Sequence, residues 1–163
     1  MNKANLMGFN FAKTLTILVM DNIYPILITE EMKKTKLDDC FSFHLWVEYI
    51  PRILMKWRIE MYFLMAEELS LFKKYLNDES FKELIQELKE DFRCEKFNPE
   101  EFLCFSILVS FYAVIAMTRN CRNARKVAVR AIYDNIQHFE ALGELTENTW
   151  KTVLEVAKKI AIG

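Results

Sequence analysis

The sequence predicts an all-α protein, a single-domain bundle of six to seven helices around one central apolar helix. With three Gly and three Pro in 163 residues, the chain lacks the turn residues that an all-β protein of this length needs. Hydrophobic residues make up 52% and aromatic residues 13%, which excludes a disordered chain. Residues 102–117 carry no charge, whereas the flanking segments are amphipathic. A helix that is apolar on every side, among helices apolar on one side, is most simply the central one.

One helical domain is expected over residues 1–163, a length sufficient to bury a core. The four cysteines are widely spaced and form no CxxC pair, so we expect a reduced, cytoplasmic protein without structural disulfides. A net charge of -1 gives no general attraction to nucleic acid or to an anionic membrane. Lys13 interrupts the apolar N-terminal stretch and no cleavage site follows, so this stretch is expected to belong to the fold.

The first predicted helix carries apolar residues at helical spacing over residues 15–27. Pro25 should kink or end this helix. The charged stretch 30–39 is expected to be a loop, and Asp38 or Asp39 at its end can cap the next helix.

The aromatic-rich region 40–76 is predicted to contain two helices, because a proline inside a helix removes a hydrogen bond and clashes with the preceding turn. One helix should end near Tyr49 and a longer one should begin at Pro51. Residues 77–80, NDES, can then cap a short amphipathic helix whose apolar residues recur over 81–92.

The central helix has three agreeing start signals. Asn98 can act as its N-cap, Pro99 suits the first helical position, and Glu100 and Glu101 suit the positive end of the helix dipole. Sixteen apolar residues give ~24 Å of helix, less than the ~30 Å hydrocarbon core of a bilayer. We therefore expect a buried helix and no membrane span.

Two more helices complete the predicted bundle. One follows Asn120, carries its apolar residues on one face and can be ended by Gly143. The last should begin at Thr146 and bury Trp150 with the apolar residues that follow at helical spacing.

No residue pattern indicates an enzyme, a metal site or a cofactor. Cys40 and His44 share a helical face, but a metal needs three or four ligands and no further Cys or His lies near them in the sequence. His138 is a single histidine near a helix end, where its imidazolium suits the dipole. The carboxylates lie outside apolar stripes, and three glycines cannot build a phosphate-binding loop.

Two surfaces are candidates for binding a partner. The first is a basic cluster without an acid among its members, which could meet phosphates or an acidic protein. Its members are Arg119, Arg122, Arg125, Lys126 and Arg130. The second is the surplus of aromatic and Met residues over 41–72, which exceeds what one stripe would bury. Ile59 and Tyr62 lie off the main stripe and suggest a second apolar face, as at a central helix, a groove or a dimer surface.

The order of these segments resembles the Bcl family of apoptosis regulators (Bcl-2-like proteins), including its viral members. In this chain, the segment KTLTILVMDNIYPIL is similar to the first helix of that family. The segment SFKELIQELKEDF is similar to the fourth helix, and FLCFSILVSFYAVIAM is similar to the central helix. Its sixth helix is similar to NARKVAVRAIYDNIQHFEALGEL, and the helix after it to TENTWKTVLEVAKKI. The resemblance covers most of the chain and is one of pattern and order.

The resemblance implies a helical bundle that binds a short amphipathic helix of a pro-apoptotic protein in a surface groove. The residues expected to line that groove are Tyr49, Ile53, Trp57, Met61, Met65, Ile85, Leu88, Glu101 and Phe105. The family usually carries Asn-Trp-Gly-Arg at the start of its central helix, and its Arg pairs with an acid of the ligand. This chain has Asn98, Pro99, Glu100 and Glu101 there, so an acid replaces the expected base.

The sequence therefore predicts a non-enzymatic protein-interaction module that inhibits apoptosis or innate immune signalling by binding host proteins, as in a host–virus interaction. A homodimeric scaffold that uses the same aromatic surface remains an alternative. A helical nucleic-acid-binding module that uses the basic cluster is a third, and it predicts affinity for DNA or RNA that falls steeply with salt.

Overall fold

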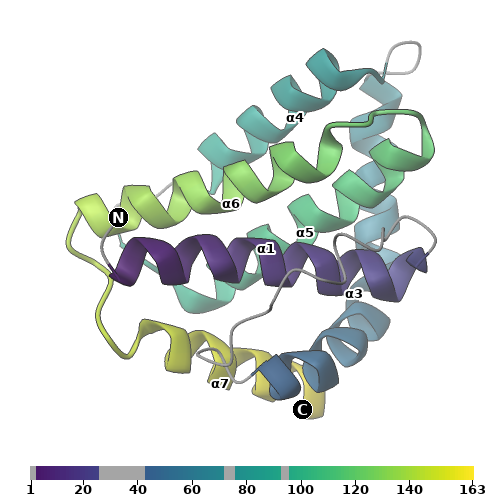
Figure 1. Cartoon of the computed structure of the whole chain (residues 1–163). Coiled ribbons are helices and arrows are strands. Elements are labelled where there is room, and N and C mark those ends of the chain that lie inside the picture. Colours follow the sequence, from purple (N-terminus) through teal and green to yellow (C-terminus); the bar gives the residue numbers. More distant parts are fainter. Residues whose placement is uncertain (1–2, 26–42, 72–75, 93–95) are drawn as a thin grey trace.

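The computed structural model describes residues 3–25, 43–71, 76–92 and 96–163, and these contain six α-helices and no strand. The predicted all-α class is therefore confirmed. In chain order the helices are α1 (Lys3–Ile23), α3 (Phe43–Leu71), α4 (Asp78–Asp91), α5 (Pro99–Thr118), α6 (Ala124–Ala141) and α7 (Thr149–Ile162) (Figure 1). The loop predicted at 30–39, its capping Asp38 or Asp39, and Cys40 lie outside the described residues.

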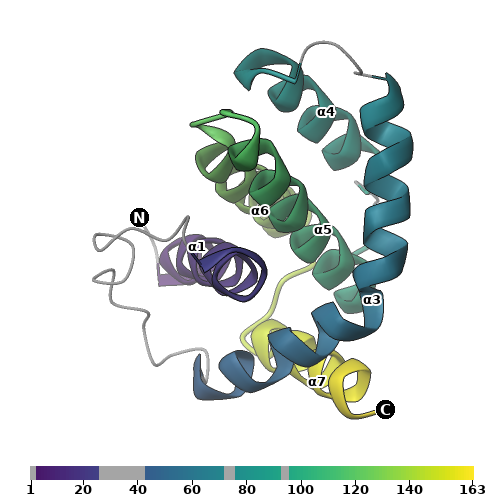
Figure 2. The same ribbon diagram turned by 90° about the vertical axis from the view of Figure 1, so that its right-hand side faces the viewer.

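The central position of α5 is confirmed. The other five described helices all contact it, and Figure 2 shows it in the middle of the bundle. Thirteen of its 20 residues are buried, and its apolar residues are spread around the whole helix. Because every side of α5 meets another helix, a continuous apolar run is what its environment requires.

Two helices, α4 and α5, start at the predicted caps. At α5, the side-chain oxygen of Asn98 accepts hydrogen bonds from the N–H groups of Glu100 and Glu101, at 3.0 and 3.1 Å. At α4, Asn77 and Ser80 form a capping box, in which each side chain bonds the backbone of the other.

Helices α5 and α6 end in the same backbone motif. Asn120 after α5 and Gly143 after α6 have φ values of 69° and 73°, in the left-handed region. The following N–H reaches back five residues in both cases, from Cys121 to the Ala116 carbonyl and from Glu144 to the Phe139 carbonyl. These are Schellman motifs, which satisfy the last carbonyls of each helix.

The predicted break at Pro51 is wrong, because α3 continues through it from Phe43 to Leu71. A proline at this position removes the hydrogen bond to the carbonyl of Val47. Val47 is 44% exposed, so water can solvate its carbonyl and the helix tolerates the loss. The helix bends instead, as Figure 2 shows: its first part lies on α7, and its second part runs toward the start of α4.

The last helix begins at Thr149, three residues later than predicted. Thr146 is held in the preceding turn, where its N–H donates to the Thr149 hydroxyl at 2.8 Å and its carbonyl accepts from the Thr149 N–H at 3.2 Å. The bond to the Thr149 hydroxyl therefore holds Thr146 in the turn before α7, because it competes with extension of the helix toward the N-terminus.

Aromatic side chains join the helices across the core. Phe11 of α1 lies with its ring centroid 5.6 Å from Trp46 of α3, 5.7 Å from Phe102 of α5 and 4.9 Å from Trp150 of α7. Each such pair contributes about 0.5–1.5 kcal/mol beyond the area it buries. One residue thus fixes four helices relative to one another.

Candidate protein-interaction site

Most of the residues that the sequence suggested for a groove are core residues. Trp57 is half-buried, Glu101 is exposed in the first turn of α5, and the side chain of Met65 lies outside the described part of the chain. The others are buried, with exposures of 7% or less: Tyr49, Ile53, Met61, Ile85, Leu88 and Phe105. Since buried side chains contact this chain's own helices, the surface that a partner would meet is formed largely by other residues.

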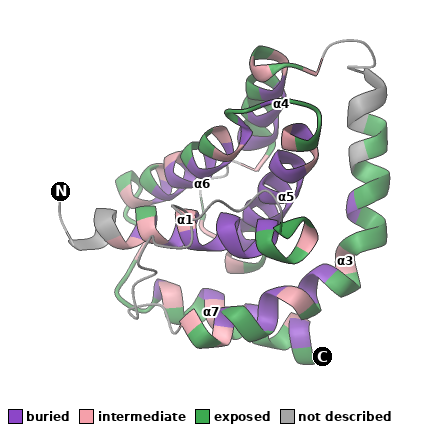
Figure 3. Cartoon of the chain, turned by 45° about the vertical axis from the view of Figure 1, so that its right-hand side comes forward, coloured by how far each residue is buried: buried purple, intermediate pink, exposed green. Residues whose placement is uncertain are grey.

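An exposed apolar surface runs along the second part of α3. We call it the outer ridge and define it as Met55, Ile59, Tyr62, Phe63 and Ala66. The first four are 82%, 71%, 41% and 70% exposed, and Ala66 is exposed as well. In Figure 3 the second part of α3 accordingly appears exposed along the edge of the bundle. Exposed apolar side chains at this density are unusual on a monomer and mark interaction sites.

The second apolar face that Ile59 and Tyr62 suggested is thus present. The sequence analysis counted Phe63 in the aromatic surplus but did not assign Met55 or Phe63 to this face, although they stand four residues before and after Ile59 and so share its side of the helix. The available signal was helical spacing around Ile59.

A cleft of about 320 Å³ adjoins the outer ridge, between the end of α1, the middle of α3 and the second half of α5. We call it the α3 cleft. Its apolar lining comprises Ile23, Pro51, Leu54, Met55, Met61, Tyr62 and Phe111. Tyr62 packs edge-on against Phe111 with the ring centroids 5.1 Å apart, which joins α3 to α5 at the base of the cleft.

Arg58 is the only charged residue among the described residues that line the α3 cleft. Its guanidinium carbon lies 5.7 Å from the centroid of the Tyr62 ring, in reach of a cation–π interaction. Arg58 is exposed, and it forms no ion pair with another described residue. A positive side chain held at the rim by an aromatic ring is poised to meet an acidic group of a ligand.

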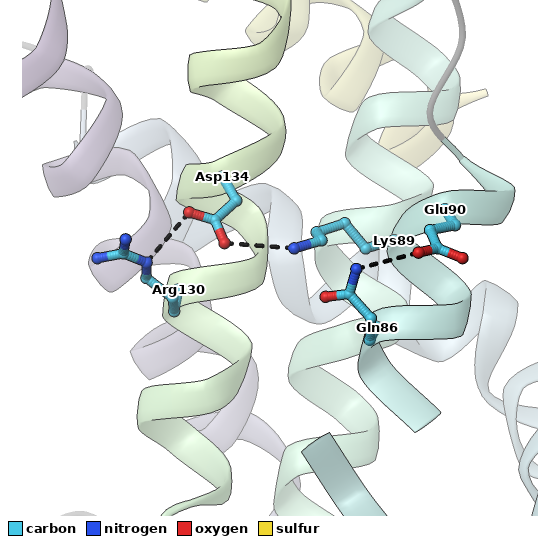
Figure 4. Close-up of polar contacts among 5 residues, drawn as sticks. All are labelled: Gln86, Lys89, Glu90, Arg130 and Asp134. Atoms are coloured by element: carbon cyan, nitrogen blue, oxygen red, sulfur yellow. Dashed lines mark hydrogen bonds and ion pairs between the residues drawn. The ribbon is translucent and has the colours of Figure 1, made fainter. Parts of the chain in front are cut away.

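A second cleft, of about 390 Å³, lies between α4 and α6. Its wall is tied together by a three-residue network that Figure 4 shows: Asp134 pairs with Lys89 at 3.3 Å and with Arg130 at 3.1 Å. Gln86 and Glu90 of α4 bond each other beside it at 3.2 Å. Because Lys89 is buried, its ion pair with Asp134 compensates a charge that water does not reach freely.

The predicted basic cluster lies at the corner between α5 and α6 and along the outer side of α6. Arg119, Arg122 and Lys126 are exposed, Arg125 is half-buried, and the exposed Arg130 is paired with Asp134. One of the five charges is therefore used within the fold. The cleft beside the cluster, between α4 and α6, has carboxylates and no aromatic side chain among its described lining residues, whereas base stacking needs aromatic side chains.

Cys104 and Cys121, the thiols in the described part of the chain, do not make a reactive site. Burial raises the pKa of Cys104, and Glu100, Glu101 and Glu60 raise it further because a thiolate beside carboxylates is disfavoured. Burial also raises the pKa of Cys121. Both thiols therefore stay protonated near neutral pH, where a nucleophile needs thiolate. Within the described residues, no three His, Cys, Asp or Glu side chains gather as a metal site would require.

Comparison of the chain with protein-family models, with curated proteins and with solved structures found no match. Of the described helices, α5 alone is long and apolar enough to cross a membrane, and 72% of its apolar window is buried inside the bundle. The buried core helix of a soluble protein has the same length and composition.

Proposed function

We propose that this chain is a non-enzymatic protein-interaction module that binds an amphipathic helix of a partner protein in the α3 cleft. The observation that carries the proposal is the composition of this cleft, which has an apolar lining on three helices and a single charge at its rim. Its volume of about 320 Å³ suits one or two apolar side chains of a ligand.

The expected ligand is a helix with two apolar residues one turn apart and an acid beside them. Apolar residues spaced three or four apart share one face of a helix and can enter the cleft together. The acid would meet Arg58, which is positioned over the Tyr62 ring. Met55 and Met61 favour this use as well, since unbranched thioether side chains adapt to different ligand shapes.

The resemblance to the Bcl family supports a biological role for this binding. In that reading the chain acts in the cytoplasm, and the partner is a pro-apoptotic or innate immune signalling protein whose helix is sequestered. The site proposed here differs from the predicted groove, because six residues of that groove are in the core and only Met61 belongs to both sets. Arg58 would supply the positive charge that Glu101 cannot.

The test is a titration of fluorescently labelled helices from pro-apoptotic proteins against the purified chain, followed by anisotropy. We expect saturable binding of at least one helix at about 50 μM protein or less, a strength typical of small interfaces. Absence of binding by all of them at that concentration would refute the role in apoptosis and leave signalling proteins to be screened in the same way.

Two charge reversals locate the binding. Arg58→Glu should weaken binding at least tenfold, because it places an acid against the acid of the ligand. Arg122→Glu makes the same change on an exposed residue at the corner between α5 and α6 and serves as the matched control. Equal affinities of the two variants would exclude the α3 cleft as the site.

A further inference from the structure

The outer ridge of α3 has the spacing of a coiled-coil seam. Met55, Ile59, Tyr62 and Ala66 are separated by four, three and four residues, which is the alternation of the apolar positions in a heptad. They form one continuous line along the exposed side of α3, and two of them, Met55 and Tyr62, also line the α3 cleft. Phe63 widens this line at its second half. A straight apolar seam of this kind fits another helix lying along α3.

The apolar area of the outer ridge is close to what each subunit contributes to a small specific dimer interface. With about 200 Å² for a large side chain, the exposed fractions of its members amount to roughly 500 Å², near the upper end of the largest patches on monomers. Two ridges in contact would bury about 1,000 Å² in total, the lower limit for a specific interface. The expected association is therefore weak to moderate.

The charges along α3 select the direction of pairing. Residues 43–58 carry Glu48, Arg52, Lys56 and Arg58, which gives +2, whereas residues 59–71 carry three glutamates and no base, which gives -3. Parallel helices would place like charges together. Antiparallel helices would place the basic half of one on the acidic half of the other, at both ends. A sequence with this polarity is complementary to itself under a two-fold axis.

We propose that two copies of the chain pair antiparallel along the outer ridges of α3. The two-fold axis then passes between positions 60 and 61. Met55 of each copy lies opposite Ala66 of the other, and Ile59 lies opposite Tyr62. This pairing follows antiparallel seam geometry, in which the two kinds of apolar heptad position face each other. It goes beyond ligand binding in the α3 cleft, since Ile59, Phe63 and Ala66 do not line that cleft.

The first measurement is sedimentation of the full chain from about 1 to 200 μM, a range that spans the affinity of small interfaces. We expect a monomer–dimer equilibrium that shifts toward monomer as salt is raised, because the charged halves attract. Ile59→Asp should raise the dissociation constant at least tenfold. Leu142→Asp, an equal change at an exposed position after α6, should leave it unchanged.

The second measurement tests the direction, in a background with Cys40, Cys94 and Cys104 changed to Ser. The double variant Met55→Cys/Ala66→Cys should form a disulfide-linked dimer under mild oxidation, and each single variant should not. In the antiparallel pair the two copies of residue 55 are separated by about 16 Å along the axis. A dimer from Met55→Cys alone would overturn the antiparallel pairing, and a monomer at every concentration would overturn the proposal.

The two proposals can fail independently. Ile59→Asp should weaken pairing at least tenfold and keep binding of the labelled helix. Arg58→Glu should weaken binding of the labelled helix when added to Ile59→Asp, where pairing is already weakened. A chain that dimerises and binds no helix refutes only the proposed function. Loss of dimerisation by Leu142→Asp would place the interface away from α3.

Discussion

Gly8 in α1 allows a close approach of α1 to α6, and Gly8→Ala tests how tightly these helices are packed. A Cβ atom at this position would lie 2.8 Å from the Cγ2 atom of Ile136. Carbon atoms prefer separations of about 3.5–4.0 Å, so the helices would have to separate by roughly 0.7 Å. Ile136 is buried and β-branched, and its Cγ2 cannot rotate away without leaving the preferred rotamer.

Two effects of opposite sign decide the result. Replacing a glycine inside a helix by alanine stabilises by about 1 kcal/mol. Overpacking a well-filled interior costs about 1–3 kcal/mol. The contact at 2.8 Å is made by a stiff side chain, so we expect the cost of overpacking to exceed the gain in helix propensity. Gly8→Ala should therefore lower the free energy of unfolding by about 1 kcal/mol.

Urea unfolding followed by circular dichroism gives this free energy, and the same change in two Ile136 backgrounds isolates the cause. In Ile136→Ala the clashing atom is gone and the remaining Cβ stands at 3.7 Å, so Gly8→Ala should stabilise by up to about 1 kcal/mol. In Ile136→Val the γ-methyl group remains, and Gly8→Ala should still destabilise. An equal effect of Gly8→Ala in all three backgrounds would refute the packing explanation.

Three further predictions concern the caps, the buried ion pair and the thiol. Asn77→Ala should cost about 1 kcal/mol in urea unfolding, whereas Asn148→Ala, at an N-cap without a side-chain bond, should cost only a few tenths; equal losses would contradict the capping argument. Asp134→Ala should lower stability by about 2 kcal/mol because it leaves the buried Lys89 unpaired, and Lys89→Met in that background should restore part of the loss; no recovery would contradict this cause. The pKa of Cys104 is raised, so the rate of its alkylation by iodoacetamide should rise with pH at a midpoint above that of a model cysteine peptide, and a midpoint below it would contradict the burial described here.

Helix positions could be predicted from the sequence where the signal is local. Asn98 and Pro99 mark the start of α5, Asn77 marks the start of α4 and Gly143 ends α6, because each acts on backbone groups within one turn of itself. Pro51 is also a local signal, but the helix end that it predicted is not present. Its effect depends on whether the carbonyl it leaves unbonded is solvated, and that is settled by the packing around α3.

The sequence by itself determined that this protein is helical and that α5 is its centre, because a helix apolar on every side needs neighbours on every side. Only the tertiary structure decided which apolar face of α3 is core and which is surface. Tyr49 and Ile53 are buried, whereas Ile59 and Phe63 are exposed, although all four are apolar residues of one helix. The sequence shows only that burial of an apolar side chain is favourable in free energy. Which apolar side chains of α3 are buried depends on the helices that pack against it.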